Sequence, residues 1–293
     1  MNIDQLNIPL SDQEVFFYWI KERESIRRKK EAGLPKPWTT DPIFQKYKFT
    51  NVRREDDKVT VWIKNNWRDP CRGHQNMWFA MIVARLFNWP PTLDLIGFPL
   101  SDFDILKPIW RMQLKVARDE LKQKIFTGAY LVSTNGVSMD KVDYILDRVL
   151  TPIWERGLAP SSAGEYSDSV TLESYWHFLL QFDGLGSFMA GQVIADLKYV
   201  DPVLEKASDW WSWAPLGPGS IRGLNRFAGR DYRKSLKQEK GLQELLQLQQ
   251  QIEERLGIKL PVHDVQNCCC EYDKMLRLKK GEGSVRSGYN GVN

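Results

Sequence analysis

The sequence is poor in cysteine and histidine and has no long apolar run. It holds 4 Cys and 3 His in 293 residues; three of the cysteines are contiguous, and Cys71 lies far from them. This spacing fits neither paired zinc ligands nor a disulfide framework, so we expect no structural metal site. Apolar runs are broken by charge or proline before the ~18 residues that a membrane span needs. The N-terminal MNIDQLNIPLSDQE also lacks the regions of a signal peptide, so we expect a cytoplasmic protein that does not bind a membrane.

The net charge of +4 is small, but the positive residues are unevenly placed. Basic runs occur in KERESIRRKK (21–30), RDYRKSLKQEK (230–240) and KMLRLKK (274–280). Such patches suit phosphate contacts, although a solvated helix face has the same composition. The 12 tryptophans could stack on bases as well as fill the core.

Helical periodicity dominates the chain and predicts an all-α fold. It recurs near residues 12–30, 53–66, 74–88, 102–124, 139–157, 171–182, 187–199, 235–257 and 262–278. TVWIKNNW and GAYLVS are the only strand candidates, and each is short enough to be a helix end or a loop. Breaks rich in proline and glycine lead us to expect two helical lobes, 1–160 and 161–293, with a cleft between them.

A glycine-bearing turn precedes one of these helices, in FDGLGSFMAGQVIADL (182–197). Glycine tolerates positive φ, so Gly184 and Gly186 would leave the N–H groups of the turn and of Ser187 unblocked. Together with the helix dipole, these groups would suit a DNA phosphate. A plain turn between two helices would use the same residues.

The stretch resembles the helix-hairpin-helix of base-excision DNA glycosylases. Gly184, Gly186 and Ala190 fit the pattern of that motif, and Asp209 follows at the distance where the superfamily carries a catalytic aspartate. The residues after the aspartate depart from it, because DWWSWAPLGPGSIRGLNRF stands where the glycosylases have Thr and His. Cleavage of a glycosidic bond therefore does not carry over, and glycosylase activity on a modified pyrimidine stays an alternative.

Five further segments resemble the phage α-glutamyl/putrescinyl thymine pyrophosphorylases, also called amino acid:DNA transferases, and the related helical domain of 5-hydroxymethyluracil DNA kinases. They are TTDPIFQKYKFTNVRREDDKV (39–59), ARLFNWPPT (84–92), TGAY (127–130), LGPGSIRGLNRFAG (216–229) and CCEYDK (269–274). The resemblance implies a transferase that acts on double-stranded DNA with a modified thymine. It would replace the pyrophosphate of a phosphorylated 5-hydroxymethyluracil with a free amino acid, the co-substrate.

The resemblance also suggests site residues. In the fourth segment we expect Ser220 to cap a helix, and Arg222, Asn225 and Arg226 to bind pyrophosphate or a DNA phosphate. Asn51, Arg54 and Asp57 match family positions, and their spacing would place them along one side of a helix. Glu271 with Lys274, and Arg85 with Asn88, are further pairs for substrate binding or its support. Each set also has a structural reading, as a capped helix or an exposed ion pair.

For proton transfer from the incoming ammonium we expect Asp209, with Asp57 in reserve. Alternatively, Asp209 caps the tryptophan-rich turn that follows it and is structural. Cys270 is a conceivable nucleophile, but nothing beside it indicates a lowered pKa. A divalent ion stays open, and we expect a monomer in the cytoplasm of a phage-infected bacterium. A non-catalytic DNA-binding module of a kinase system is another alternative. The sequence contains no GxxxxGK[ST] loop, which argues against a kinase.

Overall fold

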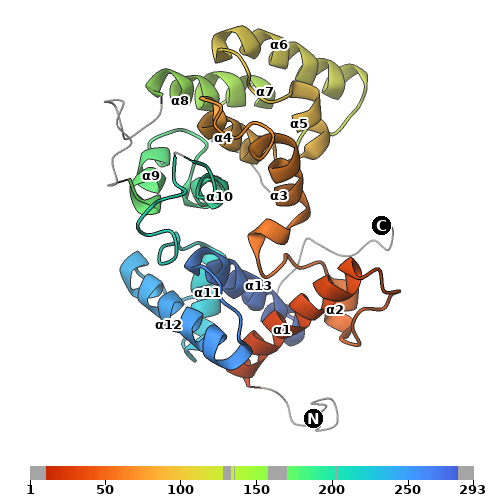
Figure 1. Ribbon diagram of the computed structural model, residues 1–293, viewed down its shortest axis with the longest axis vertical. Helices are drawn as coiled ribbons and strands as arrows, with labels where there is room; N and C mark the ends of the chain where they lie inside the picture. Colours follow the sequence, from red (N-terminus) through yellow and green to blue (C-terminus); the bar gives the residue numbers. More distant parts are fainter. Residues whose placement is uncertain (1–10, 128–132, 135, 158–169, 202, 283–293) are drawn as a thin grey trace. The chain divides into compact units, whose positions relative to one another are not determined.

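The prediction of an all-α fold is confirmed. We analysed a computed structural model that describes residues 11–127, 133–134, 136–157, 170–201 and 203–282, and no β-strand occurs in these ranges (Figure 1). The α-helices are α1 (Asp12–Glu31), α2 (Pro42–Lys46), α3 (Lys58–Ile63), α4 (Met77–Phe87), α5 (Pro90–Ile96), α6 (Phe103–Lys115), α7 (Lys141–Asp143), α8 (Thr151–Arg156), α9 (Leu172–Leu179), α10 (Ser187–Leu197), α11 (Pro218–Phe227), α12 (Gln238–Leu256) and α13 (Val262–Lys280). None of the helices described is both long and apolar enough to cross a bilayer.

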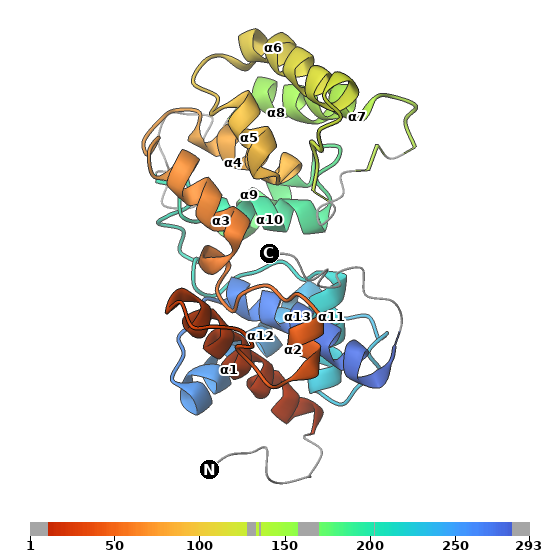
Figure 2. The same cartoon turned by 90° about the vertical axis from the view of Figure 1, so that its right-hand side faces the viewer.

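The chain forms two compact units, each described here by itself. Unit 1 joins Met1–Arg54 to Leu216–Asn293, whereas unit 2 is the continuous stretch Glu55–Pro215. This grouping differs from the expected lobes 1–160 and 161–293. The difference arises because α1, near the N-terminus, packs on α11, α12 and α13 near the C-terminus (Figure 2).

Helix α1 begins where its sequence predicts. Ser11 and Glu14 form a capping box, in which the Ser11 hydroxyl accepts the Glu14 N–H and the Glu14 carboxylate accepts the Ser11 N–H. Its buried stripe includes Phe16, whose ring meets those of Phe227 and Tyr272 edge to face at centroid distances of 5.5 and 5.3 Å. These contacts hold α1 against α11 and α13 in the core of unit 1.

Helix α11 approaches α13 closely at two glycines one turn apart. A Cβ atom on Gly219 would overlap the Cys270 side chain, and one on Gly223 would overlap the backbone carbonyl of Cys269. Neither position has room for a larger residue. The missing side chains let the two helix backbones pack directly on each other, and this contact brings the arginines of α11 to α13.

Unit 2 is built on α4, in which every residue is buried. It packs against α10 and α5. The long helices predicted at 53–66, 102–124 and 139–157 each contain a π-helical stretch, namely η3 (Lys64–Arg68), η4 (Val116–Glu120) and η5 (Tyr144–Leu150).

Both strand candidates were alternatives to helix or loop. TVWIKNNW is helical, because it lies within α3 and η3 and its Ile63 and Trp67 are buried. GAYLVS falls almost wholly outside the described residues. The short helices α2 and α5 were not predicted from periodicity. Each begins at a proline, Pro42 or Pro90, at a position where the missing N–H costs nothing.

We predict that Gly223→Ala destabilises the protein. Alanine gains about 1 kcal/mol over glycine in helix propensity, but the overlap with the Cys269 backbone costs about 1–3 kcal/mol or more, because a carbonyl cannot rotate away. The net effect is a lower free energy of unfolding, measured by urea titration. Gly186→Ala is the control, since a Cβ there meets no atom within 4 Å. Equal stability of the two variants would contradict the close packing.

Candidate functional site

The turn between α9 and α10 leaves a helix N-terminus open. Gly184 adopts a φ of 77°, but Gly186 has a φ of −65° and is the N-cap of α10, so only Gly184 needs positive φ. No side chain caps α10 among the described residues, and Gly186, Ser187 and Phe188 are exposed. The first turn of α10 is therefore exposed at the positive end of the helix dipole.

Asp209 caps a different helix. Its two carboxylate oxygens accept the N–H groups of Leu172 (2.7 Å) and Glu173 (3.1 Å), at the start of α9. Burial raises the pKa of the Asp209 carboxyl, while these two hydrogen bonds oppose the rise. Asp209 thus has a structural role. Its part in catalysis stays a prediction, because each oxygen keeps a second lone pair that could accept a proton.

The expected polar row Asn51, Arg54, Asp57 does not lie on one helix. Asn51 lies in a segment without regular secondary structure, Arg54 begins the one-turn 3₁₀ helix Arg54–Asp56, and Asp57 is the N-cap of α3. This prediction of a shared helix was wrong. The sequence pattern gave no sign that side chains of α13 bind this segment.

A ladder of hydrogen bonds ties residues 48–54 to one face of α13. Asp264 accepts the Arg54 N–H (3.2 Å), and Glu271 accepts the Thr50 N–H (3.3 Å). The amide of Asn267 donates to the Thr50 hydroxyl (3.0 Å), and Lys274 donates to the Lys48 carbonyl. The predicted pair Glu271 and Lys274, 3.8 Å apart, therefore anchors backbone as well as lining a surface.

Asn51 connects this segment to α1. It is 9% exposed, and its side-chain oxygen accepts a hydrogen bond from the Arg23 guanidinium, which also donates to the Thr50 carbonyl (3.0 Å). Arg54 is 7% exposed, and its Nε has no hydrogen-bond partner among the described residues. Buried guanidinium nitrogens usually have partners, so Arg54 is suited to an anionic ligand.

The other side of α13 carries the residues of LGPGSIRGLNRF. Gly217, not Ser220, is the N-cap of α11, so that detail of the prediction was wrong. Proline at position 218 starts the helix one turn earlier than expected. Ser220 instead accepts the Gly217 N–H (3.0 Å) and a hydrogen bond from Gln266 of α13 (3.1 Å).

Arg222 and Arg226 share one buried carboxylate. The Nε atoms of Arg222 and Arg226 donate to the two oxygens of Asp273 at 2.7 and 2.9 Å, and Asp273 is 1% exposed. Arg226 also pairs with Glu282 and lies over the Tyr232 ring, 4.5 Å from its centroid. Two carboxylates therefore already neutralise Arg226. The side chain of Arg222 is 33% exposed, and among the described residues its one ion-pair partner is Asp273. Arg222 is the better candidate for a phosphate.

Asn225 is structural. It is fully buried, donates to the Lys234 carbonyl (2.7 Å) and accepts from the Arg230 Nε (2.9 Å). These bonds fix the turn after α11 and leave its side chain no exposed surface. A direct contact between Asn225 and a substrate would need that turn to open.

Arg85 and Asn88 belong to a buried network in unit 2. Arg85 forms a two-point ion pair with Asp196 of α10, and it also donates to the Thr60 hydroxyl (2.8 Å) and the Asn88 side chain (3.0 Å). Arg85 is 2% exposed and Asp196 0%. This geometry agrees with the support role considered for the pair, because the network joins α3, α4 and α10.

Cys270 of α13 is partly exposed, and its side chain lies beside Gly219 of α11. Burial raises the pKa of its thiol to about 12, so the thiol is protonated near neutral pH. A protonated thiol is a poor nucleophile, which argues against covalent attack by this residue. In the described part of the chain no three His, Cys, Asp or Glu side chains gather as a metal site.

The two sides of α13 together define the candidate site, which we call the α13 face. Its partly exposed row consists of Gln266, Asn267, Cys270, Glu271 and Lys274. The segment 48–54 borders it on one side, and α11 with Arg222 borders it on the other. Residues predicted from three distant sequence segments are thus brought to one helix of unit 1.

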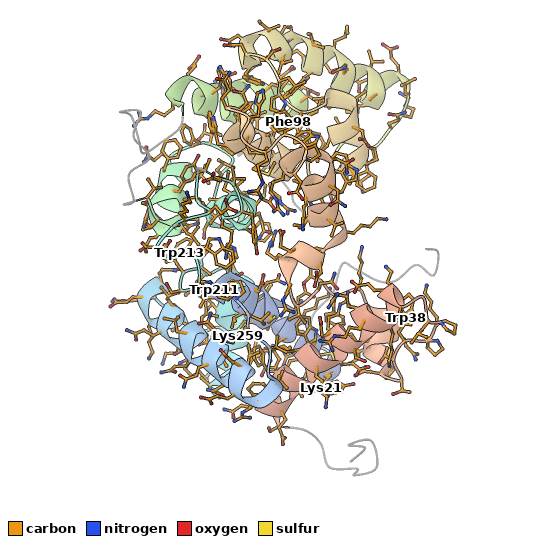
Figure 3. All side chains as sticks on the ribbon, viewed as in Figure 1. Lys21, Trp38, Phe98, Trp211, Trp213 and Lys259 are labelled. Atoms are coloured by element: carbon orange, nitrogen blue, oxygen red, sulfur yellow. The ribbon has the colours of Figure 1, made fainter. Side chains whose placement is uncertain are left out.

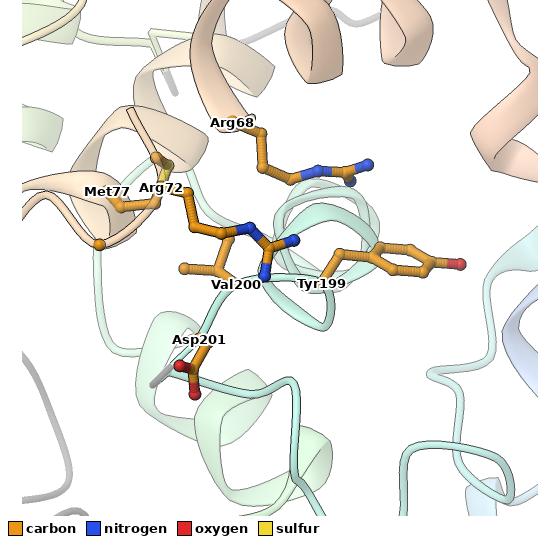
Figure 4. A pocket seen from close by; sticks show the side chains of 7 residues that line it. Arg68, Arg72, Met77, Tyr199, Val200 and Asp201 are labelled. Atoms are coloured by element: carbon orange, nitrogen blue, oxygen red, sulfur yellow. The ribbon is translucent and has the colours of Figure 1, made fainter. Parts of the chain in front are cut away.

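Sequence reasoning missed a hollow in unit 2. It is lined by the turn before α4 and the turn after α10, and includes Arg68, Arg72, Met77, Tyr199 and Asp201 (Figure 4). Arg68 is paired with Glu55 and lies over the Tyr199 ring, 4.9 Å from its centroid. The only signal in the sequence was the i, i+4 spacing of Arg68 and Arg72 in a turn-rich stretch.

Exposed tryptophan is rare among the described residues. Trp211, 54% exposed, lies with the buried Trp213 in the segment after α10 (Figure 3). The ring of Trp213 packs at 5.8 Å from that of Trp176 on α9. Five of the 12 tryptophans are buried in the core and six are partly buried, and Trp211, the exposed one, is the best placed to stack on a base.

The family that matches this all-α chain is described as 5-hmdU DNA kinase, helical domain, and its model covers residues 12–284. Because the match extends over most of the chain, the protein belongs to that family. A relative, the 5-hmdU DNA kinase of Bacillus phage SP10, is 27% identical over 240 residues, which represent 72% of this chain and 35% of the relative. The chain thus spans about a third of that relative's length. No solved structure matches it.

These findings confirm the resemblance to the kinase helical domain. The resemblances to the thymine pyrophosphorylases and to the helix-hairpin-helix glycosylases stay predictions. So do the roles of the individual site residues.

We predict that Asp209→Ala lowers the free energy of unfolding by about 1–2 kcal/mol, because two N–H groups of α9 lose their acceptor. Urea titration measures the loss. Thr171→Ala, which removes the local cap of α9, is the matched variant and should cost a similar amount. An Asp209→Ala protein as stable as the wild type would show that the cap contributes nothing.

Proposed function

We propose that the protein is an amino acid:DNA transferase that acts on DNA containing pyrophosphorylated 5-hydroxymethyluracil. The ammonium first gives one proton to a base, for which Asp209 is the candidate. The amino nitrogen then forms a bond to the 5-methylene carbon as the bond from that carbon to the pyrophosphate oxygen breaks, and the secondary ammonium that results can lose a second proton to water. The products are a hypermodified thymine and pyrophosphate. The reaction would take place in a phage-infected bacterium.

The observation that carries this proposal is the convergence on the α13 face. Asn51, Arg222, Glu271 and Lys274 come from segments that resemble the transferases, and they border one helix. Arg222 has a partly exposed side chain for a departing pyrophosphate, and Lys274 adds a second cation. The family description names 5-hmdU DNA, which supports 5-hydroxymethyluracil as the base in the substrate. The missing GxxxxGK[ST] loop supports a role other than phosphate transfer from a nucleotide.

The second candidate is a DNA-binding module without catalysis. The coverage of the relative favours this alternative, because the chain spans only 35% of a kinase relative and matches a family described as one domain of such a kinase. Under this alternative the α13 face would bind modified DNA and another chain would do the chemistry.

We predict that transfer leaves an amino acid adduct on a nucleoside, which mass spectrometry detects. The protein is incubated with pyrophosphorylated DNA and a mixture of the twenty amino acids, the DNA is digested to nucleosides, and an amino acid adduct is sought by mass spectrometry. Transfer produces an adduct together with free pyrophosphate, and Arg222→Gln should slow both by about 100-fold if it stabilises the leaving group. Binding of the DNA without any adduct would support the module instead.

A phosphate contact at the start of α10 is tested by Gly186→Asp and Gly186→Asn. Both residues cap helices well and meet no atom at this position, so stability should be kept or raised. Asp adds a negative charge and should weaken DNA binding more than Asn, lowering the slope of log K against log salt by about one. If Gly186→Asp binds DNA as tightly as Gly186→Asn and the wild type, α10 does not contact the backbone.

A further inference from the structure

Two adjoining hollows lie in unit 2, between the turn before α4 and the segment after α10. The first has a free volume of about 10 Å³, enough for one water molecule. The second has about 160 Å³ and is lined by Gly73, His74, Gln75, Met77, Trp78, Asp201 and Val203. They share Gly73, Met77 and Asp201 and form one surface, which we call the α4–α10 hollow.

Two oppositely charged side chains, from different segments, line this hollow. Arg72 comes from the turn before α4 and Asp201 from the turn after α10, as Figure 4 shows. No ion pair joins the two in the described part of the chain. Arg72 pairs with Glu205 at 3.5 Å and Asp201 with Lys206 at 3.8 Å, and all four side chains are 40% exposed or more. Such exposed pairs contribute little to stability, so a ligand can replace them.

The rest of the lining holds apolar side chains, two polar ones and a neutralised arginine. Met77, Trp78 and Val203 are each under 9% exposed and offer carbon surface, whereas His74 and Gln75 are polar. Arg68, the other arginine at the hollow, is matched by both oxygens of Glu55. The site therefore offers one guanidinium, one carboxylate, two polar side chains and an apolar wall.

We infer that the α4–α10 hollow binds a free α-amino acid. Arg72 holds the α-carboxylate, Asp201 holds the α-ammonium, and a small or apolar side chain lies against Met77, Trp78 and Val203. A single cation and a single anion match a zwitterion, whereas a phosphate or a nucleobase leaves one of the two charges unmatched. The inference rests on the proposed transfer, since it assigns the site of the amino acid that the transfer consumes.

Binding is measured first without DNA. Saturation-transfer NMR with an equimolar mixture of the twenty amino acids identifies the best ligand, and its Kd is then compared across variants. Arg72→Gln and Asp201→Asn should each weaken binding about tenfold or more with an unchanged melting temperature. Arg28→Gln and Asp104→Asn, exposed charges far along the chain, are matched controls and should bind as the wild type does. Wild-type affinity in both hollow variants, or no binding by the wild type, overturns the inference.

The role of Arg72 has its own readout. The amine that lacks the α-carboxylate of the best ligand should bind the wild type about tenfold more weakly than the amino acid does, and this preference should vanish in Arg72→Gln. A preference that survives in Arg72→Gln means that another group holds the carboxylate.

The transfer assay separates the two proposals. If the wild type forms an adduct but both hollow variants keep its KM for the amino acid, the hollow is not the site and the transfer stands. If the amino acid binds through Arg72 and Asp201 but no adduct forms on pyrophosphorylated DNA, the hollow stands and the transfer is wrong.

Discussion

The close approach of α11 to α13 is the contact on which the α13 face depends. Gly219 and Gly223 carry no side chain, so the backbone of α11 lies directly on Cys269 and Cys270. At that separation both arginines of α11 reach one carboxylate, Asp273. The opposite side of α13 is then the surface left for residues 48–54, which are bound there through side chains spaced three or four apart. One helix thereby becomes the common support of segments that are about 220 residues apart in sequence.

Buried charges explain why many motif residues act as scaffold. A carboxylate or guanidinium taken out of water needs a partner, and losing one partner of a buried pair costs several kcal/mol. Arg85 and Asp196 satisfy each other inside unit 2, and Asp273 satisfies both arginines of α11 in unit 1. Residues in such networks have little freedom to bind a substrate. The residues that keep both a partner and exposed surface, Arg222 and Lys274, are therefore the ones that can bind without loss of the fold.

The features predicted correctly from the sequence are those that depend on neighbouring residues. Long amphipathic helices with caps, such as α1 and α12, occur within a few residues of their expected bounds, because periodicity and capping act over neighbouring residues. The prediction that Asn51, Arg54 and Asp57 share one helix was wrong, because the conformation of their segment is set by side chains of α13, more than 200 residues away. The helix that Asp209 caps and the α4–α10 hollow were missed for the same reason: each joins segments that no local pattern relates. Family motifs located the α13 face, but they could not tell its anchoring residues from its exposed ones.

Helix α10 connects the features proposed for unit 2. Its N-terminal residues Gly186 to Phe188 are exposed, and its C-terminal end leads within a few residues to Asp201 at the hollow. The dipole of a helix favours anions at the first end and cations at the second, so a phosphate before Ser187 and an ammonium near Asp201 both agree with its sign. Asp196 fixes α10 to α4 through Arg85, while Lys198 and Trp210 clamp its last turn by hydrogen bonds in both directions. A rigid helix of 11 residues, about 16 Å long, would thus hold a phosphate contact and an amino acid at a constant separation.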